Sequence, residues 1–100
     1  MIDWRRIEGF DWDDGNAHKS ADKHGVSGAE AEQVFFNQPL LVFTDAKHSA
    51  DETRFHALGR TNGRRFLQIT FTLRENGTRV RVISARQMSR KERMRYEQDA

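Results

Sequence analysis

Apolar residues recur at helical spacing before residue 40, and they alternate with polar residues after it. Residues 13–24 begin with aspartates that can cap free N–H groups, and Gly25 suits the left-handed position that ends a helix. Residues 27–30, SGAE, match a capping box, and an apolar face continues from them until Pro39 disfavours helix. The first part of the chain is therefore predicted to contain two helices, over residues 13–24 and from residue 27 to about 38.

Alternation predicts four strands, over residues 40–45, 53–61, 64–74 and 78–86. Asn-Gly pairs at 62–63 and 76–77 join the last three, and this dipeptide is the strongest short-range signal of a β-hairpin. A second capping box, SRKE at 89–92, starts a final helix that extends to about residue 98. The pattern predicts one α+β domain over residues 1–100, with two N-terminal helices, a four-stranded antiparallel sheet and a C-terminal helix.

The same alternation divides the strands between a buried face and an open face. Ile69 and Phe71 belong to the buried face, together with Val80 and Val82. The open face is predicted to carry Arg54, His56, Arg60, Gln68, Arg79 and Arg81. Since none of these positions is acidic, the face is expected to bind nucleic acid or another phosphate-bearing ligand. One solvated polar face is also ordinary for an antiparallel sheet, and this is the alternative explanation.

Arg86 is an exception to this division. Its place in the alternation puts it on the inward side, near the end of the last strand. Burying an unpaired guanidinium is costly, so Arg86 is expected either to reach past the sheet edge or to pair with a carboxylate.

Charge is distributed unevenly along the chain, although the formal net charge is only +2. Residues 1–53 carry five Lys and Arg against eleven Asp and Glu, whereas residues 54–100 carry twelve against four. All but one of those twelve are Arg, whose planar fork suits bidentate binding of phosphate. The basic half indicates a nucleic acid, an acidic protein partner or a solvated basic surface.

The chain contains no Cys, which excludes disulfides and thiolate metal sites and suits a reducing compartment. Its first residues contain no apolar segment typical of a signal peptide. Its longest apolar run, residues 40–43, is too short to span a bilayer. We expect a soluble, cytoplasmic protein with no membrane partner.

The four His residues lack the spacing typical of a metal site, and neither a nucleophile elbow nor a Gly-rich phosphate loop is present. We therefore expect no metal and no cofactor. The chemistry that remains is metal-free cleavage of RNA, in which the 2′-OH of the substrate is the nucleophile. Arg side chains can stabilise charge in the transition state, and His or Lys can transfer protons.

Three stretches of the sequence resemble the BrnT family of bacterial toxins. They are FDWDDGNAHKSADKHGVSGAEAEQVF, DAKHSADETRF and RVISARQMSRKERMRYE, and the resemblance extends over residues 10–97. It implies a RelE-like fold and a ribonuclease toxin of a type II toxin-antitoxin system, which inhibits translation and growth. It also implies a DNA-binding, BrnA-like antitoxin that neutralises the toxin, and a toxin-antitoxin complex that binds operator DNA.

The resemblance extends to individual residues. Lys23 and His24 match KH in the family signature, Arg54 matches an E-x-R context and Arg86 matches SAR. These four are expected to be catalytic, with Lys23 or His24 transferring protons and the two arginines binding the phosphate. The residues expected to bind RNA are His56, Arg60, Arg79, Arg81, Arg93 and Tyr96. One departure is Ser20, where many family members have Asn.

Each of these residues also has a structural explanation. Lys23 and His24 can cover the last carbonyl groups of their helix, and Tyr96 can anchor the last helix on the sheet. An alternative function is a non-catalytic nucleic-acid-binding module or corepressor that acts with a DNA-binding partner. A third possibility is that the basic face chiefly docks an acidic antitoxin segment.

Overall fold

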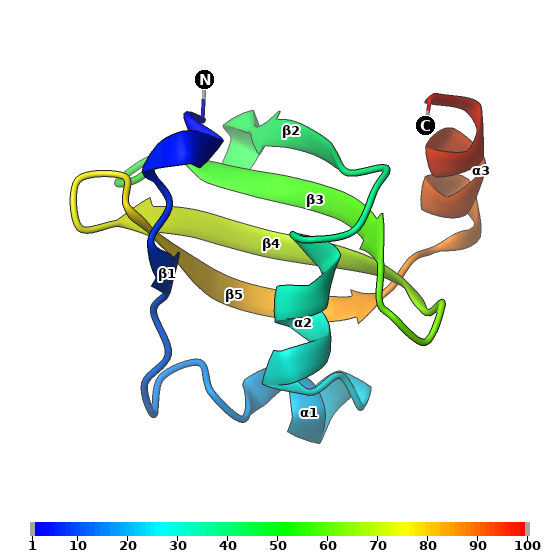
Figure 1. The fold of residues 1–100 in the computed structure, drawn as a ribbon, viewed down its shortest axis with the longest axis horizontal. Coiled ribbons are helices and arrows are strands. Elements are labelled where there is room, and N and C mark those ends of the chain that lie inside the picture. Colours follow the sequence, from blue (N-terminus) through cyan, green and yellow to red (C-terminus); the bar gives the residue numbers. More distant parts are fainter. Residues whose placement is uncertain (1, 100) are drawn as a thin grey trace.

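The computed structural model describes residues 2–99, so residues 1 and 100 of the expected 1–100 domain lie outside the described residues. Short 3-10 helices are labelled η. Within this range the elements follow in the order η1 (Trp4–Arg6), β1 (Gly9–Phe10), α1 (Lys19–His24), α2 (Gly28–Val34), β2 (Leu41–Asp45), η2 (Ala46–His48), β3 (Arg54–Arg60), β4 (Phe66–Arg74), β5 (Arg79–Gln87) and α3 (Arg90–Asp99) (Figure 1).

The sheet is mixed and has the strand order β1-β5-β4-β3-β2 across the described residues. Strands β2 to β5 pair antiparallel, as predicted, but β1 adds a parallel partner beside β5. The prediction of a purely antiparallel four-stranded sheet is therefore wrong. Two residues are too short to show an alternating pattern, so β1 left no signal in the sequence.

The two predicted N-terminal helices are also wrong in their extent and place. A 3-10 turn and β1 precede them, α1 begins only at Lys19, and α2 ends at Val34. The amide of Asn16 explains the late start of α1, since it donates to the backbone oxygens of Asp11 and Val82 at 3.0 and 2.9 Å. This bonding holds the preceding residues in turns along the edge of β5. The capping box at Ser27 is confirmed.

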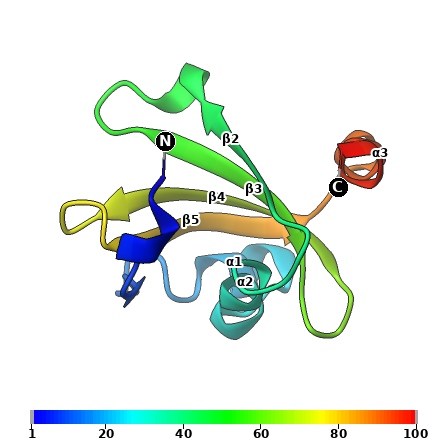
Figure 2. The same cartoon turned by 45° about the horizontal axis from the view of Figure 1, so that its top comes forward.

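Helices α1 and α2 cover one face of the sheet, whereas α3 stands at one end of it (Figure 2). The core between the helices and the sheet contains Val34 of α2 and Leu67, Ile69 and Phe71 of β4, all fully buried. Helix α2 approaches β3 so closely that a Cβ on Gly59 would lie 2.7 Å from Cγ1 of Val34. Glycine at this position allows the close packing.

A β-bulge in β5 decides which residues reach the open face. Thr70 pairs with Ser84, but its neighbour Phe71 pairs with Val82, so Ile83 is an extra residue. Val82 keeps the predicted inward position and is buried. Beyond the bulge the alternation is reversed, and Arg86 pairs with Gln68 on the open face. The predicted inward position of Arg86 is therefore wrong, because the extra residue shifts the pleat by one.

Candidate functional site

The open face of the sheet contains a hollow of about 460 Å³ between β2, the middle of the sheet and α3. We call it the open-face hollow. Its charged and polar lining includes Asp45, Lys47, His56, Gln68, Arg86, Glu92 and Arg95. Two residues predicted from the sequence, His56 and Arg86, thus share one cavity. They come from β3 and β5, which lie on the two sides of β4.

His56 is held through both of its ring nitrogens. Its Nε2 lies 3.0 Å from a carboxylate oxygen of Asp45. The amide nitrogen of Gln68 lies 2.6 Å from Nδ1, and the Thr70 hydroxyl is 3.0 Å away. If Nδ1 accepts from the amide, Nε2 carries the proton that is donated to Asp45. The side chain of His56 is still 33% exposed, so its ring is accessible from the hollow.

Asp45 connects two histidines at the end of β2. The same carboxylate oxygen that contacts His56 lies 3.0 Å from Nδ1 of His48. Burial raises the pKa of Asp45, but the hydrogen bond with His48 and the neighbouring His56 more than offset this effect, so the pKa is lowered. The side chain of Asp45 is only 9% exposed. Asp45 is therefore a buried anion that orients the His56 ring.

Arg86 forms a two-pronged ion pair with Glu92 of α3. Its two terminal nitrogens donate to the two carboxylate oxygens at 2.8 and 2.9 Å. The hydrogen bond with Glu92 raises the pKa of Arg86. The expectation that Arg86 pairs with a carboxylate is thus confirmed. Glu92 also accepts a hydrogen bond from the backbone N–H of Ser89 and completes the second predicted capping box.

Two further cations lie at the hollow. Arg95 places its guanidinium carbon 3.8 Å from the centre of the Phe43 ring. Lys47 is exposed at the beginning of the β2–β3 connection. The hollow therefore combines Lys47, Arg86 and Arg95 with two carboxylates, and one of those carboxylates already neutralises Arg86.

Arg54 lies on the open face next to the hollow. It is two residues before His56 in β3, and it pairs in register with Asp45 and Thr72. It does not line the hollow, and within residues 2–99 its guanidinium has no carboxylate partner. Arg60 is exposed at the other end of β3.

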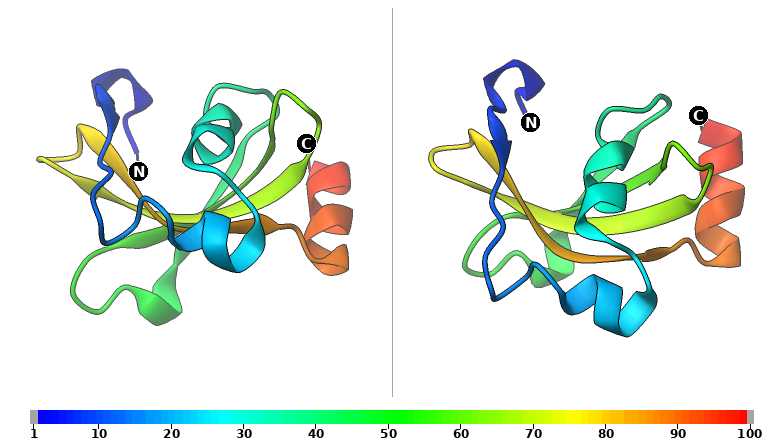
Figure 3. Two further views of the ribbon diagram at one scale, coloured as in Figure 1. Left: turned by 90° about the horizontal axis from the view of Figure 1, so that it is seen from below. Right: turned by 60° about the horizontal axis from the view of Figure 1, so that its bottom comes forward.

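Lys23 and His24 lie away from this hollow. They form the end of α1, which packs against β5 (Figure 3). Both side chains are exposed, and Gly25 follows in the expected left-handed conformation with φ 67°. The structure therefore does not bring the four residues predicted as catalytic into one cavity.

Arg79 and Arg81 are engaged with the N-terminal part of the chain. Arg79 donates to the backbone oxygen of Phe10 at 2.6 Å. Arg81 contacts the carboxylates of Asp11 and Asp13, and the hydrogen bond with Asp13 raises the pKa of Arg81. Both arginines thus fasten the chain around β1 and its continuation to the sheet.

Tyr96 and Arg93 pack α3 against the sheet. The Tyr96 hydroxyl donates to the backbone oxygen of Pro39 at 2.6 Å, and the side chain is buried. Burial raises the pKa of Tyr96. The guanidinium carbon of Arg93 lies 3.5 Å from the centre of the Phe66 ring.

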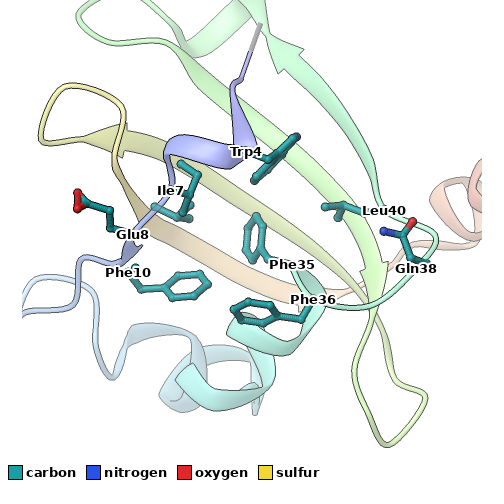
Figure 4. A pocket seen from close by; sticks show the side chains of 10 residues that line it. Trp4, Ile7, Glu8, Phe10, Phe35, Phe36, Gln38 and Leu40 are labelled. Atoms are coloured by element: carbon teal, nitrogen blue, oxygen red, sulfur yellow. The ribbon is translucent and has the colours of Figure 1, made fainter.

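A different kind of pocket lies on the helical side of the sheet. It measures about 500 Å³ and is lined mostly by aromatic and aliphatic side chains, which include Trp4, Phe10, Phe35 and Phe36 (Figure 4). Phe36 is 76% exposed. This lining suits apolar groups and offers little acid-base chemistry besides Glu8.

Neither a metal site nor a membrane-spanning helix is found in the described part of the chain. Among residues 2–99, no three His, Asp or Glu side chains are grouped so that they could hold a metal ion. None of the helices in this range has the length and apolar character needed to cross a membrane.

Sequence reasoning missed Asp45, Lys47, Glu92 and Arg95 as members of the site. The alternation predicts Asp45 only as the last residue of a strand, and the SRKE pattern predicts Glu92 only as a capping residue. Their roles depend on how β2 and α3 approach β3 and β5, which no local pattern encodes. The only available signal was that DAKH lies in one of the stretches that resemble the toxin family.

Together, the fold and the hollow define a small α+β protein with a polar, partly basic site on the open face of a mixed sheet. A family model described as "Ribonuclease toxin, BrnT, of type II toxin-antitoxin system" matches residues 12–92. The match extends over most of the chain, which therefore belongs to the BrnT family of ribonuclease toxins.

A solved structure supports this membership. The 1.1 Å crystal structure of the Brucella abortus ribonuclease toxin BrnT is 25% identical in sequence, with a TM-score of 0.60. The similarity covers 82% of this chain and 97% of the Brucella chain. A search of curated proteins finds no match. Membership of a type II toxin-antitoxin family implies an antitoxin partner.

Proposed function

We propose that this protein is a metal-independent endoribonuclease toxin that cleaves RNA in the open-face hollow. The observation that carries the proposal is the position of Arg86, which the bulge at Ile83 turns toward the hollow that also contains His56. A proton-transfer group and a phosphate-binding group thereby lie in one exposed site. These are the two functions that cleavage of RNA requires from the protein.

The reaction proposed is an internal transfer of the phosphodiester. The 2′-oxygen loses its proton and forms a bond to phosphorus, while the bond from phosphorus to the 5′-oxygen breaks. The 5′-oxygen leaves with a proton, and the products are a 2′,3′-cyclic phosphate and a 5′-hydroxyl. The atoms balance without water, metal or a redox partner.

His56 is the proposed proton-transfer residue. Asp45 holds Nε2, so Nδ1 is the nitrogen that exchanges its contact with Gln68 for a contact with the substrate. The carboxylate of Asp45 contacts Nε2 at 3.0 Å and fixes the orientation of the ring. Asp45 is therefore a positioning residue in this proposal.

Arg86 is the proposed phosphate-binding residue, supported by Lys47, Arg95 and the neighbouring Arg54. The geometry that Arg86 uses to bind the two oxygens of Glu92 also suits two oxygens of a phosphate. Substrate binding then replaces one bidentate anion by another, and Glu92 keeps its capping contact with the N–H of Ser89.

Lys23 and His24 are the alternative proton-transfer residues, because the family resemblance assigns them to catalysis. In that case the reaction takes place at the end of α1, and Arg86 acts from a distance or only binds RNA. The two versions predict different effects of replacing His56 and His24.

The partner proposed is a BrnA-like antitoxin with a DNA-binding domain. Its binding blocks access to the RNA surface, and the complex of the two proteins binds operator DNA. Because the proposed substrate is RNA and the proposed partner binds DNA, the protein is proposed to act in the cytoplasm.

The test uses purified toxin without antitoxin, added to single-stranded RNA in excess EDTA. We expect cleavage products that end in a cyclic phosphate, and a rate that falls by about 100-fold or more in His56→Ala. His18→Ala is the matched control, since His18 is exposed and makes no side-chain cap contact. Intact RNA, with and without ribosomes, would overturn the enzyme proposal. Salt-dependent binding without cleavage would favour the non-catalytic nucleic-acid-binding function.

A further inference from the structure

A second basic cavity lies at the end of the sheet where β5 leads into α3. It measures about 440 Å³, and four arginines line it: Arg64, Arg65, Arg90 and Arg93. The rest of its lining is Phe66, Gln87, Met88 and Ser89, so no carboxylate is part of it. We call it the arginine hollow.

Two of its arginines are free to bind a ligand. Arg64 and Arg90 are exposed, and neither forms an ion pair or side-chain hydrogen bond within residues 2–99. Arg65 differs, because it donates to both carboxylate oxygens of Glu30 and to the backbone oxygen of Gly25. Arg65 thus holds one wall in place, while Arg64 and Arg90 supply charge that the described protein does not neutralise.

The hollow also contains a flat stacking surface. The guanidinium of Arg93 covers the ring of Phe66 at 3.5 Å, and its Nε has no hydrogen-bond partner within the described residues. The Arg93 side chain is 43% exposed, and its Nε lies 3.8 Å from a carboxylate oxygen of Glu97, one turn further along α3. A guanidinium plane that is supported by an aromatic ring can stack on a nucleobase.

The backbone around the hollow is fixed at two points. Helix α3 begins at Arg90 beside the hollow, and its first turn is capped by the Ser89 hydroxyl and the Glu92 carboxylate. Arg64 has a left-handed backbone with φ 63°, which is uncommon for a residue with a side chain. In the connection between β3 and β4, an arginine thus occupies a backbone conformation that glycine would adopt with less strain.

We propose that the arginine hollow binds a nucleotide of single-stranded RNA outside the bond that is cleaved, with its phosphate on Arg64 and Arg90 and its base on Arg93. The identity of the ligand as RNA rests on the proposed function. Helix α3 borders both sites, because Glu92 and Arg95 line the open-face hollow and Arg90 and Arg93 line the arginine hollow.

An acidic protein segment is the competing ligand for such a cavity. Carboxylates would use the charges of Arg64 and Arg90, but they would gain nothing from the exposed plane of Arg93. The stacked pair of Arg93 and Phe66 favours the nucleic acid, since stacking on a base requires both a flat surface and an accessible face.

The experiment measures binding of a short 2′-O-methyl oligoribonucleotide, which cannot be cleaved, by fluorescence anisotropy at several salt concentrations. The variants are the double variant Arg64→Ala/Arg90→Ala and, as control, Arg5→Ala, whose side chain is 92% exposed and pairs with Asp3. For the double variant we expect an affinity about tenfold lower and a salt slope about 1.4 smaller, which corresponds to two lost phosphate contacts in a single strand. Arg5→Ala should bind as the parent does.

Arg93→Lys separates stacking from charge. It keeps the positive charge, so we expect an unchanged salt slope with an affinity about fivefold lower, because one base loses its stacking partner. Equal affinity and slope in all variants would overturn the proposal. A loss of binding to a poly-glutamate peptide, with RNA binding unchanged, would overturn it in favour of an acidic protein ligand.

Failure of the proposed function gives a different pattern. Binding of the uncleavable oligonucleotide does not depend on His56, so the arginine hollow can be confirmed even if the parent protein leaves ordinary RNA intact. Conversely, cleavage that persists while both variants of the arginine hollow bind as the parent does would retain the enzyme and overturn the arginine hollow. Thermal unfolding of each variant verifies that it is folded.

Discussion

Arg86 and Glu92 face each other across the turn from β5 to α3 and form two parallel hydrogen bonds of 2.8 and 2.9 Å. The same carboxylate caps the first turn of α3 through the N–H of Ser89. One acidic residue therefore stabilises the helix and occupies the proposed phosphate-binding group. Removing the charge of Glu92 should therefore weaken the stabilisation of α3 and, at the same time, make Arg86 more available to bind phosphate.

Glu92→Gln is expected to bind RNA more tightly and to fold less stably than the parent. The amide leaves the fork of Arg86 available, while weaker capping and pairing should lower the free energy of unfolding by about 1 kcal/mol. Anisotropy titration and urea unfolding measure the two effects. Glu75→Gln, an exposed loop position with the same change of charge, is the control. An unchanged RNA affinity in Glu92→Gln would contradict the role of Arg86 in binding phosphate.

Acid should destabilise the fold through two paired glutamates. The hydrogen bond from Arg65 lowers the pKa of Glu30. Burial raises the pKa of Glu92, but the hydrogen bonds from Arg86 and Ser89 outweigh it, so that pKa is lowered too. Carboxyl groups whose pKa is lower in the folded state stabilise it fully above their ordinary value of 4.5, and this contribution is lost as the pH falls through the folded-state values. Urea midpoints between pH 6 and pH 3 should therefore fall below about pH 4.5, and less steeply in the double variant Glu30→Gln/Glu92→Gln.

Asp45→Asn should slow cleavage mainly through the rate of the chemical step. The asparagine can still contact His56, but its uncharged amide fixes the ring and its tautomer less firmly than the carboxylate does, so we expect a roughly tenfold or greater fall in kcat with little change in KM. The pH profile of kcat should also shift, which a loss of folding alone would not cause. An unchanged profile would remove Asp45 from the proposed mechanism.

His24→Ala tests the competing assignment of proton transfer. If the reaction takes place in the open-face hollow, this variant should cleave RNA within about threefold of the parent, while His56→Ala loses about 100-fold or more. The reverse order would move the reacting centre to the end of α1. Both histidines are at least partly exposed, so neither replacement leaves a large cavity.

Gly59→Ala tests the packing between α2 and β3. The new methyl group would lie 2.7 Å from Cγ1 of Val34, and such overpacking typically costs about 1–3 kcal/mol. Gly63→Ala is the control, because its Cβ would meet only the Thr61 hydroxyl at 3.8 Å. The double variant Gly59→Ala/Val34→Ala should be more stable than Val34→Ala alone in thermal unfolding, because the new methyl group occupies part of the space that Val34 leaves.

Local signals in the sequence were sufficient for the elements that depend on neighbouring residues. The capping boxes at Ser27 and Ser89 and the two Asn-Gly hairpins form as predicted, because their hydrogen bonds link residues that are close along the chain. Membership of the toxin family could also be inferred from the sequence, since its motifs extend over most of the chain.

Features that depend on distant residues could not be predicted in this way. Strand β1 exists because residues 9 and 10 meet β5 some 70 residues later in the chain, as the register of Gly9 with Arg79 records. Asp45 becomes part of the candidate site only through its approach to His56, a contact between two strands. The direction of Arg86 depended on a single extra residue that the alternation of Arg and Val did not reveal.

The bulge at Ile83 reverses the alternation of β5, so that different residues face outward before and after it. Before it, odd-numbered residues face outward and fasten the N-terminal segment through Arg79 and Arg81. After it, even-numbered residues face outward and supply Arg86 to the hollow. Deleting Ile83 would remove the bulge and leave one regular alternation, with Val82 and Ala85 still facing the core and Arg81 and Arg86 still facing outward. Pairing Ile83 as an ordinary strand residue, without a bulge, would instead turn Arg86 toward the core. The placement of the cationic group is thus set by a count of residues, independently of which side chain occupies position 83.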